Sequence, residues 1–318
     1  MTKIEEIVQG VLNGDRRSIA RAITIIENNT AETQKLIASI YPHTGKAHII
    51  GITGPGGSGK STLIEKIIRK YRQRGKTVGV IAVDPTSPFT GGAFLGDRIR
   101  MQELSTDQGV FIRSMATRNY MGGIAKATKD AVKVLDAAGK DIVIVETVGA
   151  GQSEVEIIKV AQTIVVICAP GLGDEIQAIK AGMMEIADIF VVNKADRENA
   201  DKALMDIQAM LQLNNKEKAW KTPILKTAAL TGKGVLQLVE KIEEHKHFLE
   251  KELERKRSRE KAEAELTEAI KEKVAASIIE NLKREGKFEE FLQKILEKEM
   301  DPASAAEKLL HKKLRKKP

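Results

Sequence analysis

Seven apolar segments rich in β-branched residues recur through the middle of the chain. They are AHIIGIT (47–53), TVGVIAV (77–83), VFIRSM (110–115), DIVIVET (141–147), TIVVICA (163–169), IFVVNK (189–194) and PILKTAA (223–229). Most are continuously apolar, as expected for strands that are covered on both faces. Helical stretches at Ser61–Arg74, Ile124–Ala138 and Glu175–Ile186 separate several of them. This alternation predicts an α/β domain over residues 47–235, with a doubly wound, mainly parallel sheet.

Helical sequence flanks this region on both sides. Apolar residues between Ile4 and Leu12 recur at i, i+3 and i+4, which predicts an amphipathic helix within an N-terminal helical segment, residues 1–46. From Lys241 to Leu282 the chain is highly charged and contains no proline or glycine. We therefore expect residues 236–318 to form a helical dimerisation arm with a basic tail; a helix folded back on the domain is the alternative. His245 and His247 lie two residues apart, on different faces of this helix, which argues against a metal site.

Composition narrows the functional class. The single cysteine, Cys168, excludes an intramolecular disulfide and favours a reducing compartment. No apolar stretch approaches the roughly 20 residues that cross a bilayer, and the first residues do not resemble a targeting signal. We therefore expect a cytoplasmic protein without membrane contact. The net charge is +8, but much of the excess lies in the final HKKLRKKP, and no aromatic residues alternate with the basic ones, so we expect no nucleic acid partner.

A glycine-rich segment, GITGPGGSGKST, joins the first predicted strand to the helix that follows it. It matches G-x-x-x-x-G-K-[ST], in which backbone N–H groups and a helix N-terminus bind phosphate oxygens. The lysine of this motif reaches the β and γ phosphates, and its Ser/Thr hydroxyl binds Mg²⁺. The predicted nucleotide-binding residues here are Gly54, Gly56, Gly57, Ser58, Gly59, Lys60, Ser61 and Thr62.

Guanine specificity is indicated by NKAD (193–196) at the end of a later apolar run. The Asp196 carboxylate can accept hydrogen bonds from the guanine N1–H and N2–H₂, which adenine cannot supply, and a site built on such a pairing rejects the wrong base. Asn193 would hold the base loop together, and the stem of Lys194 can lie along the purine. Ala228 and Ala229, in TAALTG (227–232), would form a second base-contacting loop. Together with the phosphate loop, these residues predict a GTPase.

Three carboxylates that follow predicted strands complete the expected site. Glu146 ends DIVIVE and can hold Mg²⁺ directly or through water, while the N–H of Gly149, in E-x-x-G, would approach the γ-phosphate. Asp84 follows the strand after the phosphate-loop helix, and Asp97 lies in the long loop DPTSPFTGGAFLGDRIRM, which we interpret as a switch that orders around metal and nucleotide. Gln152 is either a residue that orients the attacking water or a helix cap.

Taken together, these motifs resemble the MeaB/ArgK family of GTPases. AVDPTSPFTGGAFLGDRIRM, FIRSMATRNYMGGIA, ETVGAGQSE and VVNKAD carry the resemblance, which extends over most of the chain. It implies a SIMIBI-type GTPase that uses GTP/GDP and Mg²⁺, forms a homodimer, and acts as a chaperone for an adenosylcobalamin-dependent acyl-CoA mutase, chiefly methylmalonyl-CoA mutase. GTP turnover would be coupled to cofactor loading and protection, and a cobalamin adenosyltransferase would be a further partner.

The resemblance also assigns residues. It implies Mg²⁺ contacts from Ser61, Asp84, Asp97 and Glu146, with Lys60, Asp97 and Glu146 serving hydrolysis, and an additional switch at PGLGDEIQAIKAG containing Asp174, Gln177 and Lys180. Arg113, Arg118, Tyr120 and the glycines at 122–123 match a family stretch for which we derive no role. Pro55 stands one position earlier than in the family's usual G-x-P-G-x-G-K.

No arginine finger is identifiable, so we expect slow hydrolysis that the mutase accelerates. Three other functions stay open at this point. The chain could be a lysine/arginine/ornithine transport-system kinase or ATPase, a metal-insertion GTPase, or a GTP-binding scaffold without turnover. NKAD argues against the kinase, and few histidines and cysteines argue against metal delivery.

Overall fold

The computed structural model describes residues 2–84, 102–116, 126–147, 157–171, 181–213, 219–252 and 254–314. The chain divides into two compact units, Met1–Glu252 and Leu253–Pro318. The first unit contains the sheet and the helices that pack on it, and the second is helical.

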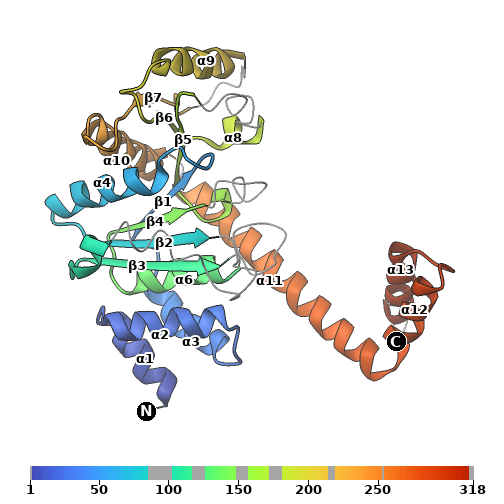
Figure 1. The fold of residues 1–318 in the computed structure, drawn as a ribbon. Coiled ribbons are helices and arrows are strands. Elements are labelled where there is room, and N and C mark those ends of the chain that lie inside the picture. Colours follow the sequence, from blue (N-terminus) through green and yellow to red (C-terminus); the bar gives the residue numbers. More distant parts are fainter. Residues whose placement is uncertain are drawn as a thin grey trace. The chain divides into compact units, whose positions relative to one another are not determined.

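A seven-stranded sheet forms the centre of the first unit (Figure 1). Its strands are β1 (His48–Thr53), β2 (Val78–Asp84), β3 (Val110–Ala116), β4 (Ile142–Glu146), β5 (Thr163–Cys168), β6 (Ile189–Val192) and β7 (Ile224–Lys226). The order is β3-β2-β4-β1-β5-β6-β7, and every neighbouring pair is parallel. Each predicted apolar run contributes a strand, so the predicted α/β fold with its parallel sheet is confirmed.

The strand order fixes where a ligand can bind. After β1 the chain builds β2, β3 and β4 on one side of that strand and then crosses to β5 on its other side. The carboxyl end of β1 therefore lies at the topological switch point, where open α/β sheets form their binding crevice.

Helices cover both faces of the sheet. On one face, α4 (Lys60–Gln73) and α10 (Val235–Glu252) enclose a core with Ile50, Ile52 and Ile144. On the other face, α6 (Lys126–Ala137), α8 (Ala181–Ile186) and α9 (Ala200–Leu213) pack in a second core. The N-terminal helices α1 (Lys3–Leu12), α2 (Arg16–Glu27) and α3 (Thr33–Ile40) extend this core by packing against α6 and one another. The described residues of this unit also form three short 3₁₀ helices, namely η1 (Tyr41–His43), η2 (Gln102–Thr106) and η3 (Ile157–Lys159).

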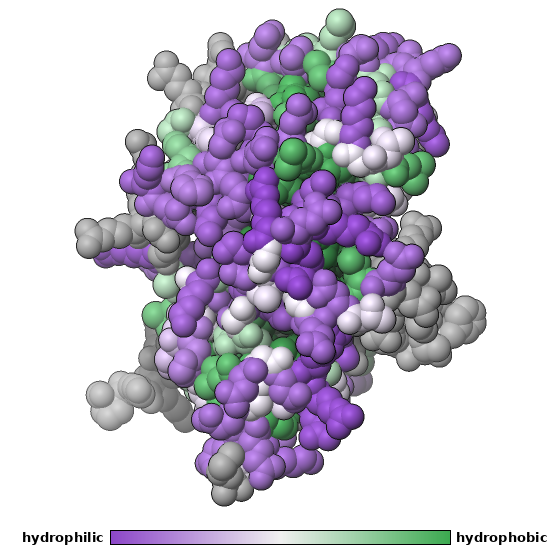
Figure 2. Space-filling model, turned by 90° about the vertical axis from the view of Figure 1, so that its left-hand side faces the viewer, coloured by the Kyte–Doolittle hydropathy of each residue, from purple (hydrophilic) through white to green (hydrophobic). Residues whose placement is uncertain are grey.

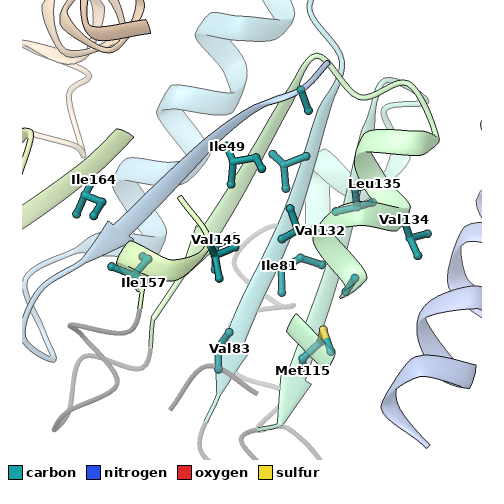
Figure 3. Packing of buried hydrophobic residues seen from close by; sticks show 14 of the residues in the cluster. Ile49, Ile81, Val83, Met115, Val132, Val134, Leu135, Val145, Ile157 and Ile164 are labelled. Atoms are coloured by element: carbon teal, nitrogen blue, oxygen red, sulfur yellow. The ribbon is translucent and has the colours of Figure 1, made fainter. Parts of the chain in front are cut away.

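Side-chain alternation along the strands supplies these two cores. In Figure 3, Ile81 of β2 lies beside Val132 of α6, Val83 lies further along β2 at the level of Met115 of β3, and Val145 of β4 lies in the same layer. Ile144, next to Val145 in the chain, belongs to the core on the opposite face, because successive residues of a strand point to opposite sides. Charged and polar side chains are left to the surface, and hydrophilic residues predominate on the face seen in Figure 2.

The N-terminal helices are joined to the sheet by polar contacts as well as by their apolar faces. Arg113 of β3 donates to Thr24 Oγ1 at 3.2 Å and forms an ion pair with Glu27. Arg16 donates to the carbonyl oxygen of Val110 at 2.6 Å. The described contacts of Arg113 are therefore with α2, whereas Arg118, Tyr120 and the glycines at 122–123 lie outside the described residues.

The second unit consists of α11 (Glu254–Arg284), α12 (Lys287–Leu296) and α13 (Pro302–Leu314). Leu282, Phe291 and Ala305 are buried within it. The first part of the segment expected to form the arm, residues 236–252, belongs to α10, whose Leu238, Val239 and Ile242 are buried in the core of the first unit. Among the described residues, no helix combines the length and apolar character needed to cross a membrane.

Candidate nucleotide-binding site

The glycine-rich loop follows β1 and ends at the first residue of α4. Gly54 has φ +139°, and a Cβ at this position would lie 2.0 Å from the carbonyl oxygen of Ile167 on β5. Gly59, with φ +90°, is the N-cap residue of α4. A side chain at Gly54 would collide with the backbone of β5, so the path of this loop depends on glycine there.

Lys60 lies across the loop that precedes it. Its Nζ donates to the carbonyl oxygens of Gly54, at 2.8 Å, and Pro55, at 3.1 Å, and the residue is buried. Gly56 and Gly57 are exposed, and nothing lies within 4 Å of a Cβ built on either. The loop is thus open to an approaching ligand, beside a buried ammonium group and the N-terminus of a 14-residue helix. Positive charge of this kind favours an anion.

Two predicted metal ligands meet at the base of the loop. Ser61 Oγ donates to Glu146 Oε1 at 2.8 Å, and Glu146 ends β4, the neighbour of β1 in the sheet. Glu146 is 4% exposed. A hydroxyl and a carboxylate oxygen are hard ligands of the type that Mg²⁺ prefers, so this pair fits the predicted metal.

The remaining predicted ligands are only partly described. Asp84 is the last residue of β2, and Ala82 two residues earlier is the register partner of Glu146. Its backbone is therefore at the same edge of the sheet as Glu146, but its side chain lies outside the described part of the structure, as does all of Asp97. Within the described part, no three His, Cys, Asp or Glu side chains form a metal-binding group.

Asn193 connects three loops beneath the expected base site. It is 1% exposed, and its Nδ2 donates to the carbonyl oxygen of Ser58 at 2.9 Å. Its Oδ1 accepts from Thr227 Oγ1 at 3.0 Å and from the N–H of Ala229 at 3.2 Å. One side chain thus holds the phosphate loop and the loop after β7 together.

Thr62, another predicted nucleotide-binding residue, lies in the first turn of α4 and is half-buried.

The rest of the NKAD motif faces outward from this junction. Lys194 has the left-handed φ of +56°, and its Nζ donates to the carbonyl oxygen of Gly57 at 2.6 Å. Ala195 donates its N–H to the carbonyl oxygen of Thr227 at 2.9 Å. Asp196 is exposed, whereas Ala228 and Ala229 are buried. Asp196 is accordingly accessible to a ligand.

Several predicted residues lie outside the described part of the chain. They are Asp97, Gly149, Gln152, Asp174, Gln177 and Lys180. The long loop that follows Asp84 belongs to the same group up to residue 101, so its interpretation as a switch stays a prediction.

Three threonines at the site were assigned no individual role from the sequence. Thr227 donates to Asn193, and Thr147 Oγ1 donates to Thr53 Oγ1 at 2.9 Å, with both threonines buried. Their only sequence signal is position, because each lies within a motif segment: Thr53 in GITGPGGSGKST, Thr147 in E-x-x-G and Thr227 in TAALTG. Cys168 is 2% exposed, and burial raises the pKa of its thiol to about 12. This cysteine is therefore a packing residue of the core.

A phosphate loop at the switch point, tied through Asn193 to a guanine-recognition motif, defines a P-loop GTPase. The chain belongs to the family described as methylmalonyl Co-A mutase-associated GTPase MeaB, which matches residues 19–283. The resemblance found in the sequence is thereby confirmed.

Relatives of known name agree with this assignment. A Pyrococcus horikoshii protein, named only as a GTPase, is 54% identical over 98% of this chain and 99% of its own length. The GTPase ArgK of Escherichia coli is 36% identical over 73% of this chain and 72% of its own. The mouse protein named methylmalonic aciduria type A homolog, mitochondrial, is 31% identical over 77% of this chain and 63% of its own.

Among solved structures, one described as an LAO/AO transport system kinase superposes with a TM-score of 0.72. It is 26% identical and is aligned over 97% of this chain and 96% of its own length. The likeness covers both units of the chain.

Proposed function

We propose that this GTPase is a chaperone for an adenosylcobalamin-dependent acyl-CoA mutase, with methylmalonyl-CoA mutase as the first candidate. It would couple GTP binding and hydrolysis to loading and protection of the mutase cofactor. The observation that carries the proposal is the family match over residues 19–283, whose description names that mutase. The name of the mouse relative points the same way.

GTP and Mg²⁺ are the proposed ligands of the site. Ser61, Asp84, Asp97 and Glu146 would hold the metal, which when bound supplies positive charge next to the phosphates. Lys60 already lies inside the glycine-rich loop and would neutralise charge on the β and γ phosphates, with loop N–H groups and that of Gly149 as donors. Catalysis would then rest on positioning and electrostatic stabilisation.

Recognition of guanine would depend on Asp196. Its carboxylate is exposed, while the neighbouring Lys194 and Asn193 are held by the phosphate loop. A carboxylate over this position accepts from two donors of guanine and finds none of that kind on adenine. We expect GTP and GDP to bind and ATP to bind far more weakly.

The proposed assembly is a homodimer formed through the C-terminal arm. The apolar side chains of Leu266, Ile270 and Val274 are 62%, 52% and 50% exposed and recur every four residues on α11. A stripe of this spacing is suited to packing against another helix, and a second copy of α11 supplies one. The proposed compartment is the cytoplasm, and a cobalamin adenosyltransferase is a further proposed partner.

The test is nucleotide hydrolysis by the purified protein, with GTP and ATP in parallel, with and without methylmalonyl-CoA mutase. The proposal expects slow turnover of GTP alone and acceleration by the mutase. GTP turnover that saturating mutase leaves unchanged would contradict this client and direct the search to another acyl-CoA mutase. Repeating the assay in EDTA tests the metal, since hydrolysis should be lost.

The kinase function and metal insertion are the competing proposals. The name of the LAO/AO transport system kinase favours the former, and preference for ATP in the same assay would support it. Binding of Ni²⁺ by the purified protein would support metal insertion. We favour the mutase chaperone because the guanine motif argues for GTP rather than ATP, and the family description names both a GTPase and the mutase.

A further inference from the structure

Two hydrogen bonds hold the end of β4, one to α4 and one to β1, and they lie on opposite faces of the sheet. On the face covered by α4, Ser61 donates to Glu146, as described above. The second is the bond from Thr147 Oγ1 to Thr53 Oγ1, at 2.9 Å. Thr53 is the last residue of β1, and Thr147 directly follows β4.

The faces follow from alternation along each strand. Ile144 belongs to the core on the α4 face, and Glu146 two residues later points the same way, towards Ser61. Val145 and Ile49 belong to the core of the other face, which is also the direction expected for Thr147 and for Thr53. The strand ladder itself extends to Thr147, whose N–H donates to the carbonyl oxygen of Ile52 at 3.1 Å.

Two bonds on opposite faces resist rotation of a strand end about its own axis. The ladder pairing of Glu146 with β1 and β2 already limits that rotation, and the threonine pair limits it further at the residue where the ladder ends. Both threonines are buried, at 0% and 2% exposure, and their β-branched side chains have few χ1 positions. The glycine-rich loop begins directly after Thr53, and Thr147 is the second residue of the E-x-x-G segment.

We propose that Thr53 and Thr147 are positioning residues of the nucleotide site, which hold the Glu146 carboxylate in the direction that a metal at Ser61 requires. The inference rests on the Mg²⁺ site proposed above. It assigns no contact with nucleotide or metal to either threonine. Partners that orient metal ligands in this way commonly affect metal affinity by about 10- to 100-fold.

The experiment measures binding of a fluorescent non-hydrolysable GTP analogue at increasing MgCl₂, and separately in EDTA. The central variant is the double substitution Thr53→Val with Thr147→Val, because replacing both partners of a buried hydrogen bond by apolar groups of the same shape costs little stability. We expect its half-saturating Mg²⁺ concentration to rise by about 10-fold, with binding in EDTA and the melting temperature unchanged.

Two further variants make the result specific. Thr147→Ser, made alone with Thr53 intact, keeps the hydroxyl and should retain the wild-type Mg²⁺ dependence. Thr163→Val removes a buried threonine hydroxyl at the other end of the same sheet, where Thr163 bonds to His48 and His245; it should leave the Mg²⁺ dependence unchanged even if it lowers the melting temperature.

The outcomes distinguish failure of this inference from failure of the proposed Mg²⁺ site on which it rests. If wild-type binding shows no Mg²⁺ dependence, the metal site itself is wrong. If wild-type binding depends on Mg²⁺ and the double valine variant, melting as the wild type does, has the same dependence, the threonine pair is structural only. A rise in the Mg²⁺ requirement of the double valine variant that Thr147→Ser does not show supports positioning.

Discussion

Lys194 Nζ donates to the carbonyl oxygen of Gly57 at 2.6 Å, so the loop after β6 is bonded to the loop after β1. Asn193 adds a second link through Ser58. The expected base site and phosphate site are therefore parts of one hydrogen-bonded structure, which has consequences for substitutions in either motif.

Asn193→Ala should lower both stability and nucleotide affinity. The substitution removes the partners of a buried carbonyl oxygen, a buried hydroxyl and the N–H of Ala229. Leaving buried polar groups unpaired costs about 1–3 kcal/mol each, so we expect a loss of at least about 2 kcal/mol in the free energy of unfolding. Urea denaturation measures it. Asn281→Ala, on the exposed surface of α11, is the control and should change nothing.

Asp196→Asn should change base specificity without changing stability, because Asp196 is exposed. The amide offers guanine one acceptor and one donor in place of two acceptors. We expect GTP affinity to fall by at least about 100-fold and affinity for xanthosine triphosphate, which has a carbonyl oxygen at position 2, to rise. Competition binding with GTP and with xanthosine triphosphate measures both affinities. Equal GTP affinity in the variant and the wild type would mean that Asp196 does not contact the base.

The sheet could be predicted from the sequence because buried parallel strands leave a strong signal. Continuous runs such as TIVVICA have few other stable solutions, and each became a strand. The phosphate loop was equally predictable, since the Gly54 position excludes a side chain on steric grounds. Both are local properties of short segments.

Contacts between segments were less predictable. The bond between Thr53 and Thr147 joins residues 94 positions apart, and nothing in either local sequence specifies the partner. Only the register of β1 against β4 brings them together. The residue at which the C-terminal helical segment leaves the first unit was difficult to predict for a related reason. Although α10 is highly charged, its few apolar residues are spaced to pack on α4 and the sheet.

Asp136→Ala should loosen the connection between η1 and β1. The buried Asp136 carboxylate accepts from the N–H groups of Gly45 at 2.5 Å, Lys46 at 3.1 Å and Ala47 at 2.9 Å. Ala47 is itself buried, so its N–H loses a partner that water cannot readily replace. We expect a destabilisation of about 2–3 kcal/mol, measured by urea denaturation. The matched control is Asp201→Ala, which removes an exposed pair with Lys226 and should cost less than about 1 kcal/mol.

The last prediction concerns a buried polar chain at the amino-terminal end of the sheet. His48 Nε2 lies 2.8 Å from Thr163 Oγ1, which lies 2.9 Å from His245 Nδ1. His245 Nε2 is 3.3 Å from Asp188 Oδ1. These contacts form a continuous chain of polar side chains from His48 to Asp188. A proton added to His48 would enter a buried site.

Burial lowers the pKa of His48 to about 3, with smaller contributions from Lys246 and His245. In the unfolded chain the pKa is about 6.5. Between these values the unfolded state binds a proton that the folded state does not, so stability should fall as the pH is lowered below about 6.5, by roughly 2 kcal/mol at pH 5.

Urea denaturation at pH 7.5 and pH 5 tests this for the wild type and for His48→Gln, which cannot take up that proton. The wild type should lose roughly 2 kcal/mol more than the variant over this interval. His43→Gln, at an exposed histidine in η1, should behave as the wild type. Equal losses in the wild type and His48→Gln would show that the proton is taken up equally by both states, and that the polar chain accommodates a charged imidazole.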